Sequence, residues 1–407
     1  MTCLAGCEGG ANGGSGGGGR DSPTTVTYTF TGSTPTAVAT QIGTGAYTQA
    51  SLQSNTLTLS IPSGTTDYSV AYVCPENNGA AVNISNINGE QVILASIEDG
   101  TSFSLICGDP SVADVGTATV QVNAAAIPGV TFVSVGEVGP NLQPWSGSTL
   151  SLSLELVSGI HDVAVIAVGA NSNVLAVRIL RNQTIPGALN GGNPVVLGAS
   201  DMTVPQTITY SNVPSGFAAP STGADYLTAG GVRVDLNFNA TSQYFAVPSG
   251  EVQSGDSYAF AAATNSTTTP SETMYVGKPQ VSGGGPQAFT FPTPWTYAGP
   301  TAAALPTFNF DYAGFSGTTD VTREGIIEWS SGTSVSSINM LASANYQNGA
   351  TAISIPDLSG ITGFIAPAPT GTTIHWQAGI GQGVSVGSVD SSSTVTSVGN
   401  SGAYTEP

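Results

Sequence analysis

The chain has 407 residues and a formal net charge of −19, from 25 acidic against 6 basic residues, and only 8% of its residues are charged. With so few bases it can form no basic surface to neutralise phosphate, which argues against nucleic acid or anionic lipid as a partner. Hydrophobic residues make up 40% of the sequence and fall in short periodic runs, so we expect a folded chain of two or three domains.

Segment 1–22 contains Leu4-Ala5-Gly6-Cys7, followed by a glycine-rich run. The tetrapeptide resembles the lipobox of bacterial lipoproteins, which implies that Cys7 becomes a lipidated mature N-terminus. Only three residues precede Leu4, so the charged and apolar regions of such a signal are missing from the printed sequence, and a chance match in a disordered leader is the alternative. The residues after Cys7 cannot bury apolar area, which predicts a flexible tether.

The rest of the chain shows the period of two that is typical of half-buried strands. Examples are Thr56–Ile61, Ala118–Val122 and Leu150–Leu156, with turn signals such as Pro62-Ser63-Gly64 and Asn88-Gly89 between strands. No window of a dozen residues has helical periodicity, and no apolar run is long enough for a membrane-spanning helix. The predicted fold class is all-β, with tandem antiparallel β-sandwich (Ig-like) domains behind a disordered Gly-rich tether.

Composition divides the folded part into four regions. We expect a β-sandwich over 23–124 that ends with the strand 118–122. A second sandwich over 125–215 should have Val163–Val168 and Val174–Leu180 as central strands, because both of their faces are apolar. Region 216–383 is one large or two small sandwiches, and 384–407 is a Ser/Gly-rich tail, frayed or forming weak edge strands.

Two cysteines end predicted strands and share a sheet face with large apolar residues. Cys74 follows Tyr68, Val70 and Tyr72 in this alternation, and Cys107 follows Phe103 and Leu105. Both sulfurs are therefore predicted to point inward and to form a disulfide, which would stabilise an exported protein by about 3 to 4 kcal/mol. Two buried free thiols are the alternative, and they would fit a cytosolic protein.

No constellation of residues indicates catalysis. Neither His161 nor His375 has metal-ligand spacing to another ligand, and His375 should point outward from a strand. Glu324 and Glu328 are a conceivable carboxylate pair without further distinction. Residues 235–239 look superficially like a calcium loop, but their alternation favours a strand with a polar face. We expect no enzyme activity, no metal and no cofactor.

The aromatic cluster Phe289–Tyr297 offers the one binding hypothesis with a mechanism. Two prolines interrupt it, so Trp295 and Tyr297 could stand on a loop as a stacking platform for a sugar ring or an apolar partner. The alternative is that both rings are buried in a seam between subdomains, because large aromatic side chains are usually buried.

Three stretches, Tyr68–Pro75, Phe103–Gly108 and Ile355–Gly360, resemble uncharacterised bacterial surface lipoproteins with tandem immunoglobulin-like or carboxypeptidase-regulatory-like sandwiches. The resemblance implies an envelope protein without known catalysis. We therefore expect a lipid-anchored, non-enzymatic interaction or structural module outside the cytoplasm, on the outer membrane if the cell is Gram-negative. Its partners would be the membrane, through Cys7, and a surface glycan or protein. The alternative is a carbohydrate-binding or carbohydrate-active accessory protein that uses region 216–383.

Overall fold

The computed structural model describes residues 22–75, 87–107, 115–136, 142–237, 242–315, 321–331, 334–385, 388–389 and 394–407. Strands dominate this part of the chain, which confirms the all-β prediction. The helical elements there are 3-10 turns of three or four residues: η1 (Ile97–Asp99), η2 (Leu189–Gly192), η3 (Ala199–Asp201), η4 (Ala313–Phe315) and η5 (Tyr346–Gly349). No described helix is long and apolar enough to cross a membrane. Cys7 and the expected tether, up to residue 21, lie outside the described residues.

The first sandwich packs a three-stranded sheet, ordered β4-β1-β7, against one end of a much larger sheet. Tyr28 and Phe103 stack in its core with ring centroids 4.8 Å apart, and Tyr28 also donates a hydrogen bond to the Tyr68 hydroxyl. Its strands are β1 (Thr24–Gly32), β2 (Ala37–Ile42), β3 (Thr48–Gln49), β4 (Thr56–Ile61), β5 (Asp67–Val73), β6 (Ile87–Ser96) and β7 (Ser102–Cys107).

The second sandwich packs the sheet β10-β9-β12-β13 against the sheet β11-β8-β14. Its strands are β8 (Val115–Asn123), β9 (Val130–Gly136), β10 (Leu142–Pro144), β11 (Leu150–Val157), β12 (Gly159–Gly169), β13 (Val174–Ile185), β14 (Gly187–Ala188) and β15 (Val195–Val196). The expected boundary at residue 124 is therefore wrong. Strand β8 pairs with β11 and buries Ala118, Val120 and Val122 in the second core, because alternation reveals a strand's buried face but not its partners.

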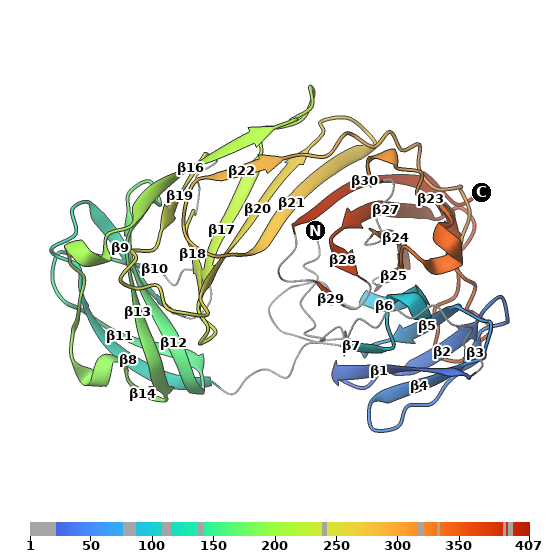
Figure 1. The fold of residues 1–407 in the computed structure, drawn as a ribbon, viewed down its shortest axis with the longest axis horizontal. Coiled ribbons are helices and arrows are strands. Elements are labelled where there is room, and N and C mark those ends of the chain that lie inside the picture. Colours follow the sequence, from blue (N-terminus) through green and yellow to red (C-terminus); the bar gives the residue numbers. More distant parts are fainter. Residues whose placement is uncertain are drawn as a thin grey trace.

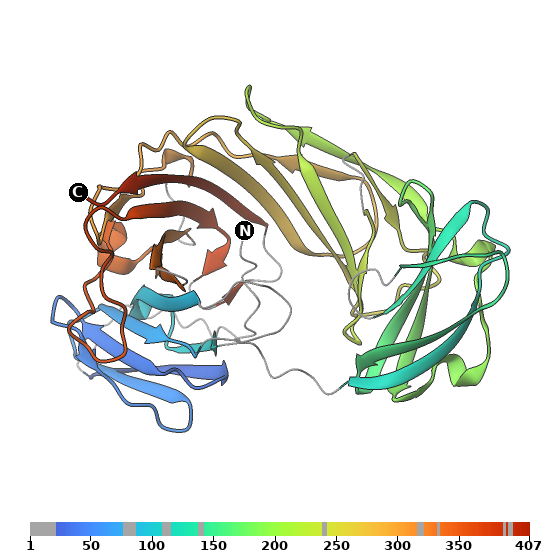
Figure 2. The ribbon, with the colours of Figure 1, turned by 180° about the vertical axis from the view of Figure 1, so that it is seen from behind.

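A twelve-stranded sheet joins the first sandwich to the C-terminal half of the chain. Its order is β18-β17-β20-β21-β30-β27-β24-β25-β6-β5-β2-β3. Strands β25 and β6 pair in parallel from Val335↔Ile87 to Ala342↔Leu94, so Asn88-Gly89, expected to form a turn, lies inside a strand. Figure 1 and Figure 2 show this sheet curving from the second sandwich at one end of the molecule to the first sandwich at the other. The first region is thus continuous with the third and is not a separate tandem domain.

The remaining strands complete this sheet or belong to three smaller sheets. They are β16 (Val204–Ser211), β17 (Ser221–Leu227), β18 (Arg233–Asp235), β19 (Gln243–Ala246), β20 (Ser257–Asn265), β21 (Ser271–Val281), β22 (Gln287–Thr290), β23 (Thr307–Asn309), β24 (Val321–Ser331), β25 (Ser334–Ala342), β26 (Ala352–Ser354), β27 (Thr373–Gln382), β28 (Val384–Ser385), β29 (Ser388–Val389) and β30 (Val395–Thr405). The sheet β19-β16-β22 and the pair β23-β26 contribute buried aromatic residues to the largest core. Strand β16 lies in the sheet β19-β16-β22, although its residues fall within the expected second domain, 125–215.

The C-terminal segment corrects the expectation of a frayed tail. Strand β30 lies inside the large sheet, paired along its length with β27 and β21. One of its glycines leaves room for a large side chain of the neighbouring strand. Trp376 is the register partner of Gly402, and a Cβ atom at Gly402 would lie 2.7 Å from the Trp376 ring. A glycine in such a strand marks the close approach of a large side chain.

Strand β12 is apolar on both faces, as predicted, and this attaches the second sandwich to the rest. Val163, Val165 and Ala167 lie in the core of the second sandwich. Ala164, Ile166 and Val168 point the other way and join the largest core. The second sandwich therefore shares apolar area with the third region along a whole strand.

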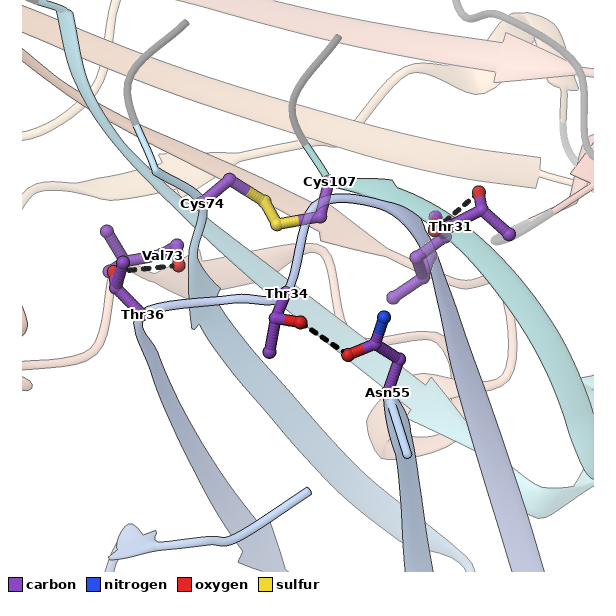
Figure 3. Close-up of a disulfide and its surroundings, with 8 residues drawn as sticks. Thr31, Thr34, Thr36, Asn55, Val73, Cys74 and Cys107 are labelled. Atoms are coloured by element: carbon purple, nitrogen blue, oxygen red, sulfur yellow. Dashed lines mark hydrogen bonds between the residues drawn. A yellow bond between two sulfur atoms is a disulfide. The ribbon is translucent and has the colours of Figure 1, made fainter. Parts of the chain in front are cut away.

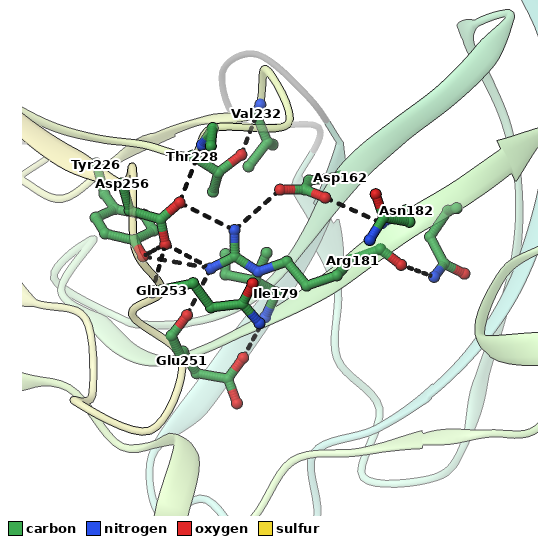
Figure 4. A network of polar contacts seen from close by, with 12 residues as sticks. Asp162, Ile179, Arg181, Asn182, Tyr226, Thr228, Val232, Glu251, Gln253 and Asp256 are labelled. Carbon is green, nitrogen blue, oxygen red and sulfur yellow. Dashed lines mark hydrogen bonds and ion pairs between the residues drawn. The ribbon is translucent and has the colours of Figure 1, made fainter.

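A buried ionic cluster fixes the same junction (Figure 4). Arg181, on β13, contacts Asp162 at 2.9 Å and Asp256 at 2.7 Å, and also donates to the Glu251 carbonyl at 2.6 Å. Asp256 accepts a further hydrogen bond from the Tyr226 hydroxyl. Burial acts to raise the pKa of Asp256, but these hydrogen bonds, with those from backbone N–H groups, lower it to about 2.

The cluster predicts a pH-dependent junction. An Asp carboxyl in an unfolded chain has a pKa of about 3.9, so the folded state binds fewer protons at intermediate pH. The stabilisation by Asp256 is then complete above about pH 4 and is lost as the pH falls towards 2. Asp256→Asn should lower the free energy of unfolding at pH 7 by about 2 to 4 kcal/mol, because Arg181 loses a buried partner. The variant should also lose less stability than the wild type as the pH falls from 4 towards 2. Urea unfolding across this pH range measures both effects.

The matched control for this prediction is Asp225→Asn. Asp225 pairs with Arg233 at 2.8 Å, but the Arg233 side chain is 55% exposed. An exposed pair contributes about 0 to 1 kcal/mol. Equal losses of stability in the two variants would contradict the special role of the Arg181 cluster.

The packing around β30 gives a second prediction. Gly402→Val should destabilise the fold by about 1 to 3 kcal/mol, because the added side chain overlaps the buried Trp376 ring. Ala403→Val is the control, since Ala403 is exposed on the opposite face, and its effect should stay within about 0.5 kcal/mol. Urea unfolding midpoints compare the two. A Gly402→Val variant as stable as the wild type would rule out this packing of β30.

Candidate functional site

The predicted disulfide is present and connects the two layers of the first sandwich (Figure 3). Cys74 and Cys107 have Cα atoms 5.3 Å apart, and Cys107 is fully buried. Beside the bond, Thr34 donates a hydrogen bond to the Asn55 side chain at 2.5 Å. Disulfides persist in oxidising compartments, so this bond bears on where the protein works.

Trp295 and Tyr297 lie in the largest core, at 3% and 6% exposure, so they form no exposed stacking platform. Their ring centroids are 4.5 Å apart, and Tyr297 meets Trp376 at 5.5 Å. The backbone N–H of Trp295 donates to the Glu272 carboxylate at 2.6 Å, and the Asn400 side chain donates to the Trp295 carbonyl at 3.1 Å. This arrangement fits the alternative expectation that the two rings are buried.

The two histidines lie in different sheets. The His161 ring nitrogen is 3.1 Å from the Ser158 carbonyl oxygen, and the neighbouring Asp162 forms an ion pair with Arg181. His161 and Asp162 therefore do not form a catalytic dyad. His375 points outward from β27, as predicted, and is exposed. His375 therefore lies free on the large sheet, whereas His161 belongs to the framework of the second sandwich.

Within the described residues, the other candidate carboxylates have no neighbour that would form a catalytic pair or a metal site with them. Glu324 and Glu328 share a face of β24 but are about 13 Å apart along it, beyond the ~5 to 9.5 Å of a glycoside-hydrolysing pair. Asp235 accepts a hydrogen bond from the Asn237 N–H at 3.0 Å at the end of β18, and Phe238 and Asn239 lie outside the described residues. Across the described ranges, no group of three or more His, Cys, Asp or Glu residues could hold a metal ion.

The candidate site is a recess on the outward face of the large sheet, where β24, β27 and β30 lie side by side. It has a volume of about 480 Å³. We name it the sheet recess. Its lining residues are Thr269, Ile326, Glu328, His375, Trp376, Gln377, Ser401, Gly402 and Ala403. Most of these side chains are half-buried or exposed, whereas Trp376 belongs to the core on the other side.

Strand register explains why these polar side chains gather. His375 pairs with Glu328 on one side and with Ala403 on the other. Two residues along β27, Gln377 pairs with Ile326 and Ser401. Directly opposed residues on one face have Cβ atoms about 4.5 to 5.5 Å apart, so the recess contains two adjacent rows of side chains.

Sequence reasoning singled out His375, considered Glu328 only as a partner of Glu324, and missed the other residues of this site. The outward direction of His375 follows from its strand, and the same alternation places Gln377 beside it. Glu328 and Ser401 could not be added, because their pairing with β27 joins segments that are distant in sequence. The sheet recess is therefore a product of the β24-β27-β30 register.

The basic residues within the described ranges are all engaged elsewhere. Three form ion pairs: Arg178 with Asp201, Arg181 with Asp162 and Asp256, and Arg233 with Asp225. Lys278 donates to the Ala288 carbonyl at 2.7 Å and lies over the Phe289 ring, and buried Arg323 donates to the Ser343 carbonyl at 2.9 Å. The sixth base, Arg20, lies outside these ranges. No Lys or Arg side chain lines the sheet recess, so the recess offers an anionic ligand neither kind of cation.

Comparisons with known proteins identify no family. No family model matches the chain, and no curated protein matches it. Among solved structures it is similar to the Bacillus anthracis TIE protein, at 9% identity and a TM-score of 0.14, with 66% of this chain and 50% of that chain covered. It is also similar to Bacteroides ovatus mixed-linkage glucan utilization locus SGBP-B in complex with mixed-linkage heptasaccharide, at 10% identity and a TM-score of 0.13, with 94% and 96% covered. This chain spans about half of the TIE protein chain, and neither likeness is close enough to assign a function.

The disulfide gives a testable prediction. Replacing Cys74 and Cys107 together by alanine should lower the free energy of unfolding by about 3 to 4 kcal/mol, because the unfolded chain is no longer cross-linked over 33 residues. Urea unfolding of the wild type with and without reductant should show the same loss. Reductant should leave the double variant unchanged, and an effect of reductant on that variant would place the redox-sensitive group elsewhere.

Proposed function

We propose that this protein is a non-enzymatic binding module held at the outer surface of a bacterial cell by a lipid on Cys7. The observation that carries the binding role is the sheet recess. It presents polar side chains that make no hydrogen bond within the described chain, on a sheet whose other face is packed against the largest core. A rigid scaffold with free polar groups suits recognition of a partner.

The disulfide supports the proposed location. Cys74 and Cys107 are joined across the first sandwich, which favours the oxidising space outside the cytoplasm over the cytosol. The excess of 25 acidic over 6 basic residues makes electrostatic attraction to anionic lipid headgroups unfavourable. Attachment through a covalent lipid on Cys7 would need no such attraction, and the glycine-rich residues that follow it would separate the folded part from the membrane.

Removal of the acceptor cysteine tests this anchoring. With an export signal added ahead of Met1, so that Cys3 is kept, the wild type should fractionate with membranes, and Cys7→Ser should move it to the soluble fraction. Several acyl chains hold a protein stably on a bilayer, whereas one chain gives only marginal binding, so the change should be nearly complete. Fractionation followed by immunoblotting measures it.

The control for the anchor is Cys3→Ser, which removes a cysteine four positions earlier and should leave the distribution unchanged. Both proteins should show the same urea unfolding midpoint, because the folded strands begin at Thr24. Membrane association that survives Cys7→Ser, or an intact mass without added lipid, would refute the anchor.

A further inference from the structure

We propose that the sheet recess binds an uncharged, hydroxyl-rich ligand, a segment of a neutral oligosaccharide or polysaccharide, through Glu328, His375, Gln377 and Ser401. This inference rests on the proposed binding role and names the ligand class for the same site. It follows from the hydrogen-bonding groups that the recess presents, from their spacing and from the charges around them.

The four side chains offer a mixed set of donors and acceptors. A carboxylate accepts only, whereas an amide, an imidazole and a hydroxyl can each donate and accept. None of the four makes a side-chain hydrogen bond or ion pair within the described chain. Every sugar hydroxyl also donates and accepts, so a ligand with several neighbouring hydroxyls can pair with all four groups.

The spacing of these groups favours an extended ligand. Glu328 lies beside His375 in one row, and Gln377 lies beside Ser401 in the next, about 7 Å along the strands. Ile326 stands next to Gln377 and supplies an apolar contact for carbon-bound hydrogens of a sugar ring. Two rows of paired polar groups on an open sheet match a ligand that lies across the strands and extends beyond the recess.

Charge argues against the competing ligand classes. An anionic ligand would need a Lys or Arg side chain in the recess, and the lining residues include neither. A lipid or an apolar peptide would need an apolar floor, but Ile326 and Ala403 are the main apolar side chains that face outward there. A polycation would need several carboxylates, and Glu328 is the one acid among the lining residues. None of these three objections applies to a neutral polyhydroxylated ligand.

The test is binding of the full chain to an array of neutral oligosaccharides of varied linkage, with sulfated and uronic acid-containing oligosaccharides and oligolysine as competing probes. We expect saturable binding to at least one neutral oligosaccharide and none to the anionic probes. Binding should persist at high salt, because uncharged partners are not screened. Titration calorimetry with the best neutral probe then gives the dissociation constant.

Two variants locate the site. Gln377→Ala and Glu328→Ala should each weaken binding about tenfold or more, since each removes a direct hydrogen-bonding partner. The matched control is Thr373→Ala, an exposed residue on the same face of β27 outside the recess, which should bind as the wild type does. Equal urea unfolding midpoints for all three variants show that any loss of binding is not a loss of fold.

Each other outcome overturns the inference. Undiminished binding by Gln377→Ala and Glu328→Ala would place the glycan site elsewhere. Salt-sensitive binding of oligolysine that depends on Glu328 would show that the recess binds a cationic partner. The proposed binding role would then be supported, and the proposed ligand class would be refuted. No saturable binding of any probe would refute the ligand class, whereas the proposed anchoring is tested separately by Cys7→Ser.

Discussion

The parallel pairing of β6 with β25 is the contact on which the rest of the architecture depends. A strand edge leaves a row of backbone N–H and C=O groups without partners, and such an edge invites pairing with another chain. Here β6, from the N-terminal part of the chain, meets β25, from near its C-terminal end, along eight register pairs. Without this pairing, β6 and β25 would each be the open edge of a separate sheet, whereas with it they lie inside one continuous sheet. The ends of the chain are thereby built into one folding unit, whose many long-range contacts should make it slow to fold.

The junction with the second sandwich combines two kinds of interaction. The shared strand β12 supplies apolar area on both faces, which is favourable but has little directional preference. Arg181, with Asp162 and Asp256, adds hydrogen bonds that require a particular geometry. Buried ion pairs contribute little net stability compared with apolar packing of the same volume. We therefore interpret the cluster as the feature that fixes how the second sandwich is oriented against the third region.

The two faces of the large sheet have different roles. The inner face carries Ile374, Trp376 and Ala378 on β27, all buried in the largest core. The outer face of the same strand carries His375 and Gln377, both exposed. Tight packing behind the strand limits its movement, so the polar groups in front are held at fixed spacing before any ligand arrives. Such preorganisation lowers the entropic cost of binding, as the proposed binding role requires.

Alternation along the chain determined the local structure well. It predicted an all-β protein, the inward direction of Cys74 and Cys107, the two apolar faces of Val163–Val168 and the outward direction of His375. Each of these properties depends on residues a few positions apart, because side chains of a strand alternate between faces. For the same reason the cysteine pair could be predicted before any strand pairing was known.

Only the tertiary structure decided which strands are neighbours. Strand β8 pairs within the second sandwich, and β30 lies inside the large sheet although it contains several glycines. Strand β6 pairs with β25, which is almost 250 residues away in the sequence. The site depended on the same choice, since Glu328, Gln377 and Ser401 are unremarkable until the register places them side by side. Trp295 and Tyr297 were distinctive in the sequence and proved to be buried. Pairing partners are selected by packing against distant segments, and a periodic pattern carries no information about those segments.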